Sequence, residues 1–382
     1  MQKKVVSVFG TRPEVIKLAP VIRELEARGD LYALVNVSCG EHDSALPPLT
    51  RLLGLRIDHE LPVAEPGPAP SEVCARVLAA LDPLLAREQP DLVLVQGDST
   101  TAVAAALAAF HRLIPVGHVE AGLRSGDARS PFPEEMNRRL ITQLAPYHFA
   151  ATRRNRDTLL AEGVPQERIF VTGNPVVASL RWILGRATPG QATAPILEAT
   201  EGLRRIVLTT DRREGGGTRT MDNLRALRRF VDRHADVALI APGHAGGSAA
   251  RAVSPLAGHG RIHLAPGLAY DELLALLTRA WLIVSDSSAI QEEAPTLGKP
   301  LLVLCDHTER PEAVEAGVAR LVGTRPGRLG MLLEQAYRDQ TWAARAADSD
   351  NPFGGGDSAI RIVHVIGRLL GAPRRAAAGE AT

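Results

Sequence analysis

At 382 residues the chain exceeds the size at which a single hydrophobic core stops growing, so two domains are expected. Its hydrophobic fraction of 45% and charged fraction of 23% are those of a folded globular protein and exclude extended disorder. The formal net charge of +1 predicts no general affinity for nucleic acid or for an anionic membrane. No apolar run is long enough to cross a bilayer and no signal peptide precedes the first predicted strand, so we expect a cytoplasmic protein.

The cysteines Cys39, Cys74 and Cys305 are odd in number and lack the spacing of metal ligands. They indicate neither a disulfide framework nor a zinc site, and we expect them to be small core residues. No metal and no cofactor is predicted for this chain.

Short β-branched runs alternate with segments of helical periodicity along the whole chain. In the first half the predicted strands are 5–9, 33–38, 91–96, 114–120, 147–152 and 168–173. In the second half they are 205–210, 237–242, 261–266, 281–286, 300–305 and 319–324. This alternation is typical of a parallel sheet covered by helices.

A stretch rich in Pro, Gly and Ala over 187–195 interrupts the alternation and is the predicted linker. We therefore predict an α/β protein of two doubly wound, Rossmann-like domains, residues 1–180 and 200–352. A C-terminal helix over 357–370 is expected to join the first domain. Since ligands of such folds bind beyond the carboxyl ends of the strands, we expect the domains to face each other across a cleft that contains the site.

The motif VFGTRPEVIKLAP follows the first predicted strand. Gly10 permits a tight turn, and Pro13 suits the first turn of a helix. Arg12 and Lys17 place two cations near a helix N-terminus, which itself attracts anions. The motif predicts an anion site, and a capped helix with a solvated arginine is the alternative.

Two carboxylates follow neighbouring predicted strands of the first domain. Asp98 lies in a strand-to-helix turn, where it is either an N-cap or a functional acid. Glu120 closes the next strand in an apolar setting, and it is either paired with Arg124 or placed for proton transfer.

Further along, Glu134 and Glu135 stand at a predicted helix start, with Arg138 one turn later. Several carboxylates that converge on one site suit general acid and base chemistry on a neutral group.

In the second domain, a predicted strand ends in a Ser-Asp-Ser-Ser segment and a helix opens at once. The hydroxyls of Ser287 and Ser288 and the free N–H groups of the helix predict an anion site. Glu293 lies too far along the helix to cap it and is suited to accept hydrogen bonds from ribose hydroxyls. The alternative is a serine-capped helix with a solvated Glu-Glu pair, which we expect for Glu292 but not for Ser287. Arg310 follows the next strand and supplies a cation.

Taken together, these motifs resemble one enzyme family over nearly the whole chain. In order they are FGTRPEVIKLAP, QGDSTT, GHVEAGLRSGD, PFPEEMNRR, TGNPV, SDSSAIQEEAPTLGKP and TERPEAVEAG. The chain resembles the non-hydrolysing UDP-N-acetylglucosamine 2-epimerases. That resemblance implies the two-domain GT-B architecture and interconversion of UDP-N-acetylglucosamine and UDP-N-acetylmannosamine without metal or nicotinamide. It also implies elimination of UDP to 2-acetamidoglucal, followed by re-addition.

The resemblance also implies roles for particular residues. The implied acids and bases are Asp98, Glu120, Glu134 and Asp211. The implied substrate-binding residues are Arg12, Lys17, Arg138, Arg212, His244, Leu268, Leu273, Ser287, Ser288, Ala289, Glu293 and Arg310. Among these, Glu293 would hold the ribose and the segment from Leu268 to Leu273 would lie near the uracil.

The chain departs from the family pattern at three places. Asp211 occupies the position of the family's catalytic histidine, in the stretch TTDRREGGG. At the phosphate site Ser288 and Ala289 stand where the family has two glycines. The segments that bind an activating second nucleotide sugar in many bacterial members read Gly-Glu-His at 40–42 and Gly-Pro-Ala-Pro at 67–70. Activation of that kind is not expected here.

Other activities stay open on the sequence. A hydrolysing variant would release UDP and N-acetylmannosamine, and Asp211 would suit the orientation of a water molecule. A UDP-sugar-binding protein without catalysis is disfavoured because Asp98, Glu120 and Glu134 are present. A glycosyltransferase is disfavoured because no acceptor pocket is indicated. The expected partner is a UDP-sugar, and a homodimer is common in the family.

Overall fold

The computed structural model of the protein describes residues 2–40, 46–63, 69–186, 190–210, 218–243, 254–265, 267–325, 327–339 and 341–371. The chain divides into two compact units. The first unit is formed by Met1–Ser179 together with Phe353–Thr382, and the second by Leu180–Pro352. Each unit is described by itself below.

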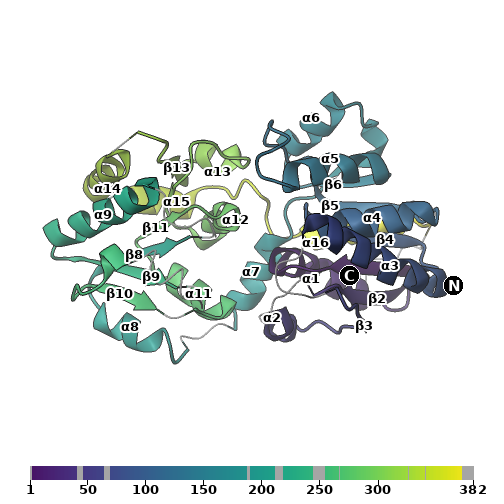
Figure 1. Cartoon of the computed structure of the whole chain (residues 1–382), viewed down its shortest axis with the longest axis horizontal. Helices are drawn as coiled ribbons and strands as arrows, with labels where there is room; N and C mark the ends of the chain where they lie inside the picture. Colours follow the sequence, from purple (N-terminus) through teal and green to yellow (C-terminus); the bar gives the residue numbers. More distant parts are fainter. Residues whose placement is uncertain are drawn as a thin grey trace, which may run out of the picture. The chain divides into compact units, whose positions relative to one another are not determined.

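The first unit is built around a parallel sheet (Figure 1). Its strands are β1 (Lys3–Phe9), β2 (Tyr32–Ser38), β3 (His59–Glu60), β4 (Leu92–Gln96), β5 (Val116–Ala121), β6 (Tyr147–Ala150) and β7 (Ile169–Val171). Its helices are α1 (Arg12–Glu26), α2 (Leu46–Leu52), α3 (Pro70–Glu88), α4 (Thr100–His111), α5 (Glu134–Leu144), α6 (Arg153–Ala161), the short η1 (Gln166–Arg168) and α16 (Ser358–Leu369). Helix α7 (Val176–Leu184) begins in this unit and ends in the second.

The strand order of this sheet is β3-β2-β1-β4-β5-β6-β7. The chain runs outward from β1 to β3 and then returns to start β4 on the other side of β1. The point at which the order reverses therefore lies between β1 and β4, where doubly wound sheets bind their ligands. Every residue of β4 and β5 is buried, because helices cover both faces of a parallel sheet.

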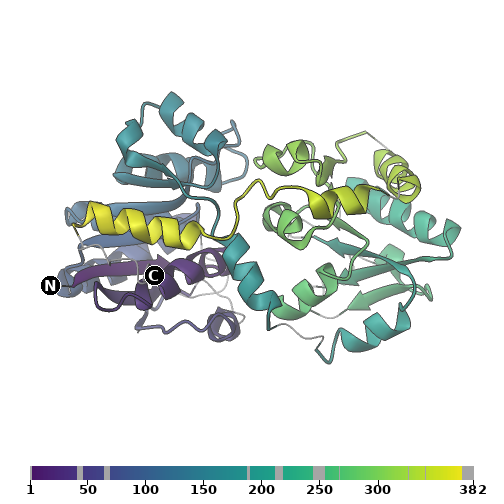
Figure 2. The same ribbon diagram turned by 180° about the vertical axis from the view of Figure 1, so that it is seen from behind.

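The C-terminal helix α16 returns to the first unit and packs against α1 (Figure 2). Ile362, Val363 and Ile366 are fully buried in this contact region. Burial of such a side chain stabilises a fold by roughly 1.5–3 kcal/mol. Among the other helices of this unit, α3 packs against α4, and α4 packs against α5.

The second unit contains a smaller parallel sheet of order β10-β9-β8-β11-β12-β13. Its strands are β8 (Arg204–Thr209), β9 (Val237–Pro242), β10 (Ile262–Ala265), β11 (Leu282–Ser285), β12 (Leu301–Val303) and β13 (Ala319–Leu321). Its helices are α8 (Ala194–Ala199), α9 (Thr218–Arg233), the short η2 (Ser254–Leu256), α11 (Tyr270–Leu277), α12 (Ser288–Leu297), α13 (Pro311–Glu315), α14 (Arg328–Arg338) and α15 (Trp342–Asp348). Here the order reverses between β8 and β11.

The predicted fold class of two Rossmann-like parallel sheets with alternating helices is confirmed. Every predicted strand is present. Strand β3 was not predicted because it is 2 residues long and contains no apolar residue. Cys39 is buried, Cys74 and Cys305 are half-buried, and none of the three forms a disulfide with another described residue. Within the described part of the chain, no helix is long and apolar enough to span a membrane.

Candidate active site

In the first unit, the turns after β1 and β4 are joined by the buried carboxylate of Glu14. Its Oε2 accepts hydrogen bonds from the backbone N–H groups of Gly10 at 2.6 Å and Thr11 at 2.8 Å. Its Oε1 accepts one from the hydroxyl of Ser99, which follows β4. Glu14 therefore fixes two loops together at the point where the strand order reverses.

Glu120, at the end of β5, belongs to a buried polar cluster at the same edge of the sheet. The Lys17 ammonium lies 2.8 Å from its Oε1 and 2.6 Å from its Oε2, and the side chains of Lys17 and Glu120 are 7% and 5% exposed. The amide of Gln96, the last residue of β4, donates a hydrogen bond to Oε2 of the same carboxylate. Lys17 thus supplies a positive charge that compensates the burial of the Glu120 carboxylate.

The backbone of Glu120 is unusual and explains where its side chain points. Its φ is +68°, in the left-handed region that residues other than glycine rarely adopt. The register between β5 and β6 shifts between Val119 and Ala121, so Glu120 is the extra residue of a bulge. A bulge re-aims a side chain, and strained residues of this kind cluster at functional sites.

The predicted alternative that pairs Glu120 with Arg124 is wrong. Arg124 forms an ion pair with Glu162 at 2.7 Å and donates to the hydroxyl of Thr142 at 2.9 Å. Arg124 thus has its partners elsewhere, although it stands only four positions from Glu120.

Asp98 is held by α5 rather than by its own helix. Ser99, not Asp98, is the N-cap of α4, and its hydroxyl accepts from the N–H of Ala102 at 3.0 Å. The Asp98 carboxylate forms an ion pair with Arg138 at 2.6 Å, and its carbonyl oxygen accepts from the Asn137 amide at 2.8 Å. The N-cap interpretation of Asp98 is therefore wrong, and the structure brings Asp98 and Arg138 together.

Arg138 is in turn anchored by Glu135, whose side chain is fully buried. The Glu135 carboxylate lies 3.2 Å from Arg138 and accepts from the Ser125 N–H at 2.9 Å. Burial raises the pKa of Glu135, but the hydrogen bonds from Ser125 and Arg139 and the charge of Arg138 outweigh it, so the net pKa lies below its usual value. Glu134 is the first residue of α5, as predicted, and it is half-buried.

The second unit presents hydroxyl groups at its own reversal point. The Thr209 hydroxyl, at the end of β8, donates to the Ser285 hydroxyl at the end of β11 at 2.7 Å. The Ser285 hydroxyl also accepts from the N–H of Ser287 at 3.0 Å. Ser287 is the N-cap of α12, yet its side chain makes no capping hydrogen bond, and Ser288 and Ala289 open the helix. The N-terminal amides of this 10-residue helix are suited to receive an anion.

Arg310 and the two glutamates of α12 occupy the interior of the second unit. The Arg310 Nε lies 2.5 Å from Glu292, and its Nη1 lies 3.0 Å from Glu309. Glu292 and Glu293 are 1% and 2% exposed, so the expectation of a solvated Glu-Glu pair is wrong. Two carboxylates fix the orientation of the Arg310 guanidinium.

Glu293 is joined to α11 by a hydrogen bond from the Tyr270 hydroxyl to its Oε1 at 2.6 Å. Burial raises the pKa of Tyr270 well above its usual value, and the charge of Glu293 adds to the effect, so the phenol stays a donor. Leu268 and Leu273, predicted near the uracil, flank the start of the same helix and are half-buried.

Comparisons with known proteins place the chain in a family. A family model described as UDP-N-acetylglucosamine 2-epimerase matches residues 23–367. The chain is 40% identical over 371 residues to the UDP-N-acetylglucosamine 2-epimerase of Salmonella typhimurium, covering 95% of this chain and 98% of that one. The chain belongs to the UDP-N-acetylglucosamine 2-epimerase family.

Solved structures of similar proteins agree with this family. The UDP-GlcNAc 2-epimerase of Neisseria meningitidis, solved bound to UDP-GlcNAc, gives a TM-score of 0.87 at 35% identity and covers 96% of this chain and 100% of its own. A co-structure of Staphylococcus aureus MnaA with UDP gives a TM-score of 0.88 at 34% identity and covers 97% of both chains.

Some predicted site residues of this epimerase family member cannot be placed. Asp211, Arg212 and His244 lie outside the described residues. Of the segments discussed for an activating ligand, Glu41 and His42, with Gly67 and Pro68, also lie outside them. Arg12 is described, and it is the exposed first residue of α1.

Several residues that organise the site in this family member were missed by the sequence reasoning. They are Glu14, Gln96, His118 and Tyr270. Glu14 lies in the first turn of the helix that follows β1, and Gln96 is the last residue of β4. Both positions are close in sequence to predicted site residues, so their place after or at the end of a strand could have identified them. His118 and Tyr270 carry no such signal, because their partners lie on other elements of the fold.

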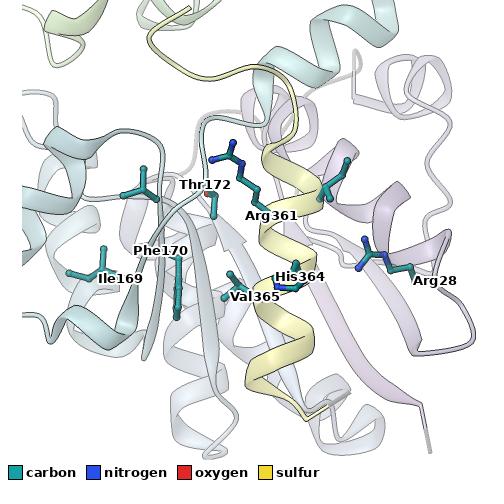
Figure 3. A pocket seen from close by; sticks show the side chains of 9 residues that line it. Arg28, Ile169, Phe170, Thr172, Arg361, His364 and Val365 are labelled. Carbon is teal, nitrogen blue, oxygen red and sulfur yellow. The ribbon is translucent and has the colours of Figure 1, made fainter. Parts of the chain in front are cut away.

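Figure 3 shows a pocket of about 530 Å³ in the first unit, between β7 and α16. It is lined by Phe170 and Thr172, by Arg361, His364 and Val365 of α16, and by Arg28. No predicted site residue is among its described lining residues. Arg28 and Arg361 have carboxylate partners in Glu24 at 2.6 Å and Asp357 at 2.7 Å, so the pocket carries little net charge.

Proposed function

We propose that this chain interconverts UDP-N-acetylglucosamine and UDP-N-acetylmannosamine at C2. The observation that carries the proposal is the convergence of Asp98 and Glu120 at the carboxyl ends of neighbouring strands, each in a defined ion pair. This arrangement occurs in a chain that belongs to the 2-epimerase family. UDP-GlcNAc and UDP are taken as ligands because solved relatives bind them.

The proposed reaction has two halves that mirror each other. A base removes the proton from C2 while the bond between C1 and the diphosphate oxygen breaks, and its electron pair leaves with UDP. The product of this half is 2-acetamidoglucal. UDP then adds back to C1 while an acid delivers a proton to the opposite face of C2. Asp98, Glu120 and Glu134 are the proposed acids and bases, since opposite faces require more than one group.

Glu120 is suited to this role because its carboxylate is fixed by Lys17 and Gln96. Proton transfer is fastest when the group is held in one position, and the bulge at Glu120 fixes its backbone as well. Binding of the diphosphate by Lys17 stays a prediction, since its ammonium already has the carboxylate of Glu120 as a partner.

The second unit is the proposed UDP-binding unit. Its support is the N-terminus of α12 with Ser287 and Ser288, the buried guanidinium of Arg310, and Glu293 oriented by Tyr270. Helix N-terminal amides favour a diphosphate, and a fixed carboxylate favours ribose hydroxyls. Asp211, Arg212 and His244 stay proposed site residues, and a homodimer and a cytoplasmic location stay predictions.

Incubation of the pure protein with UDP-N-acetylglucosamine, followed by NMR of the products, tests the proposal. Two UDP-sugars in equilibrium are expected. Free N-acetylmannosamine with UDP would instead identify the hydrolysing variant. An unchanged substrate that nevertheless binds in calorimetry would identify a non-catalytic UDP-sugar-binding protein.

A further inference from the structure

His118 lies fully buried on β5, and its imidazole reaches the turn that carries Asp98. Its Nε2 is 2.8 Å from the carbonyl oxygen of Gly97, and its exposure is 0%. A carbonyl oxygen can only accept a hydrogen bond, so Nε2 carries the proton and donates it. Burial lowers the pKa of His118 to about 4, so the ring is neutral at pH 7.

Both backbone polar groups of Gly97 form hydrogen bonds with residues of β5. Its N–H donates to the carbonyl oxygen of Val119 at 3.0 Å, while its carbonyl oxygen accepts from His118. Its φ of +71° is a conformation that glycine adopts without strain. The carbonyl of Gly97 shares a rigid peptide plane with the N–H of Asp98. The hydrogen bond from His118 therefore sets the plane from which Asp98 projects.

We infer that His118, through its hydrogen bond to the Gly97 carbonyl, is a positioning residue that presents the Asp98 carboxylate to the substrate. The inference rests on the proposed function, in which Asp98 exchanges a proton with the sugar. His118 itself does not touch the substrate. It acts on the peptide group that precedes Asp98. From α5, Asn137 donates to the Asp98 carbonyl oxygen and Arg138 pairs with the Asp98 carboxylate.

The titratable and charged residues around His118 come from neighbouring strands, turns and helices of the first unit. His148 faces it in register on β6, and Arg124, Arg138 and Asp98 act on it electrostatically. Its Nδ1 finds no hydrogen-bond partner among the described residues. Among the described residues, the hydrogen bond of the ring is therefore the one from Nε2–H to the turn.

His148 provides a matched control in the same core. It is 1% exposed, and it pairs with His118 in the sheet register. The backbone group that acts on the pKa of its imidazole is that of Ala145, which is not part of the turn that carries Asp98. A purely structural role for buried imidazoles would make the two histidines equivalent.

The test compares His118→Leu, His118→Gln and His148→Leu with the wild type, by steady-state kinetics on UDP-N-acetylglucosamine and by thermal unfolding. His118→Leu should lower kcat by about 10- to 100-fold with KM nearly unchanged, because a misplaced catalytic group slows chemistry rather than binding. His118→Gln keeps an N–H donor and should recover part of kcat. His148→Leu should lose comparable stability but keep kcat within about twofold.

Equal loss of kcat in both leucine variants, or an unchanged kcat in His118→Leu, would overturn the inference. If His118→Leu does not fold, nitrogen NMR of the wild-type imidazole decides instead. A neutral ring protonated at Nε2 is expected at pH 7, and a ring protonated at Nδ1 or at both nitrogens would overturn the inference. A wild type that converts no substrate would refute the proposed function itself, which is a distinct outcome from an active wild type indifferent to His118.

Discussion

The two units place different chemistry at the same topological position. Beside the β1–β4 reversal, at the carboxyl ends of β4 and β5, the first unit has carboxylates that are held by internal cations: Asp98 pairs with Arg138, and Glu120 with Lys17. At the β8–β11 reversal the second unit gathers hydroxyls and a helix N-terminus at Ser287. Carboxylates repel a diphosphate, whereas hydroxyls and backbone amides attract it. On this difference we base the proposal that proton transfer belongs to the first unit and nucleotide binding to the second.

The strongest test of this comparison breaks the buried ion pair of the first unit. Lys17→Met removes the ammonium that is paired with the buried Glu120 carboxylate and should destabilise the first unit by about 3–5 kcal/mol. Combining it with Glu120→Gln should recover most of that loss, because the double variant has no charge at either of these two buried positions. Chemical denaturation measures both effects.

Arg28→Met is the matched control for Lys17→Met. It removes the Arg28–Glu24 pair, in which each side chain is 25% exposed. A partly exposed pair of this kind, at the C-terminal end of α1, contributes under about 1 kcal/mol. An equal loss in Lys17→Met and Arg28→Met would show that burial of the Lys17–Glu120 pair has no special consequence.

The next prediction separates catalysis from binding. Glu120→Gln and Asp98→Asn keep the shape of the side chain but remove the proton-transfer group, so each should lower kcat by at least about 10²-fold. UDP affinity, measured by calorimetry, should stay close to that of the wild type because the second unit is untouched. Near-normal turnover in both variants, with the protein folded, would remove the first unit's carboxylates from the chemistry.

Buried histidines should make the first unit sensitive to acid. The pKa of His118 is lowered to about 4 and that of His148 to about 3, mainly by burial. Because the unfolded chain binds these protons near pH 6.5 and the folded chain does not, stability is present at pH 7 and is lost as the pH falls. At pH 5 each histidine should cost about 2 kcal/mol.

Denaturation of the wild type and of His148→Leu at pH 7 and pH 5 measures this effect. The variant should lose less stability than the wild type between the two pH values, since it has one fewer group to protonate on unfolding. Identical losses would show that His148 binds protons equally in the folded and unfolded chain, so that burial does not lower its pKa.

A smaller effect is expected for nucleotide binding in the second unit. Arg310→Ala should weaken UDP binding at least about tenfold, because a charge-assisted contact to phosphate is removed. Arg310→Lys, which keeps the charge beside Glu292, should lose less. Arg345→Ala is the control, since Arg345 is 58% exposed in an ion pair with Asp339. Calorimetry with UDP reads all three, and an unchanged affinity in Arg310→Ala would exclude Arg310 from the site.

The sequence predicted the strands and the residues that follow them, because alternation of apolar runs and turn residues is a local property. It did not predict which charges pair. Lys17 and Glu120 are 103 positions apart, and Asp98 and Arg138 are 40 apart. Arg124 is the arginine nearest to Glu120 in sequence, but it pairs with Glu162 instead. Such pairings depend on strand order and on a strained backbone, which no local pattern encodes.

Epimerisation in D2O tests the central claim most directly. If proton removal and return at C2 occur at different groups on opposite faces, the proton taken from the substrate exchanges with solvent before re-addition. We predict that UDP-N-acetylmannosamine formed from unlabelled UDP-N-acetylglucosamine carries deuterium at C2, as read by NMR. A product that keeps its original proton at C2 would contradict the elimination and re-addition route.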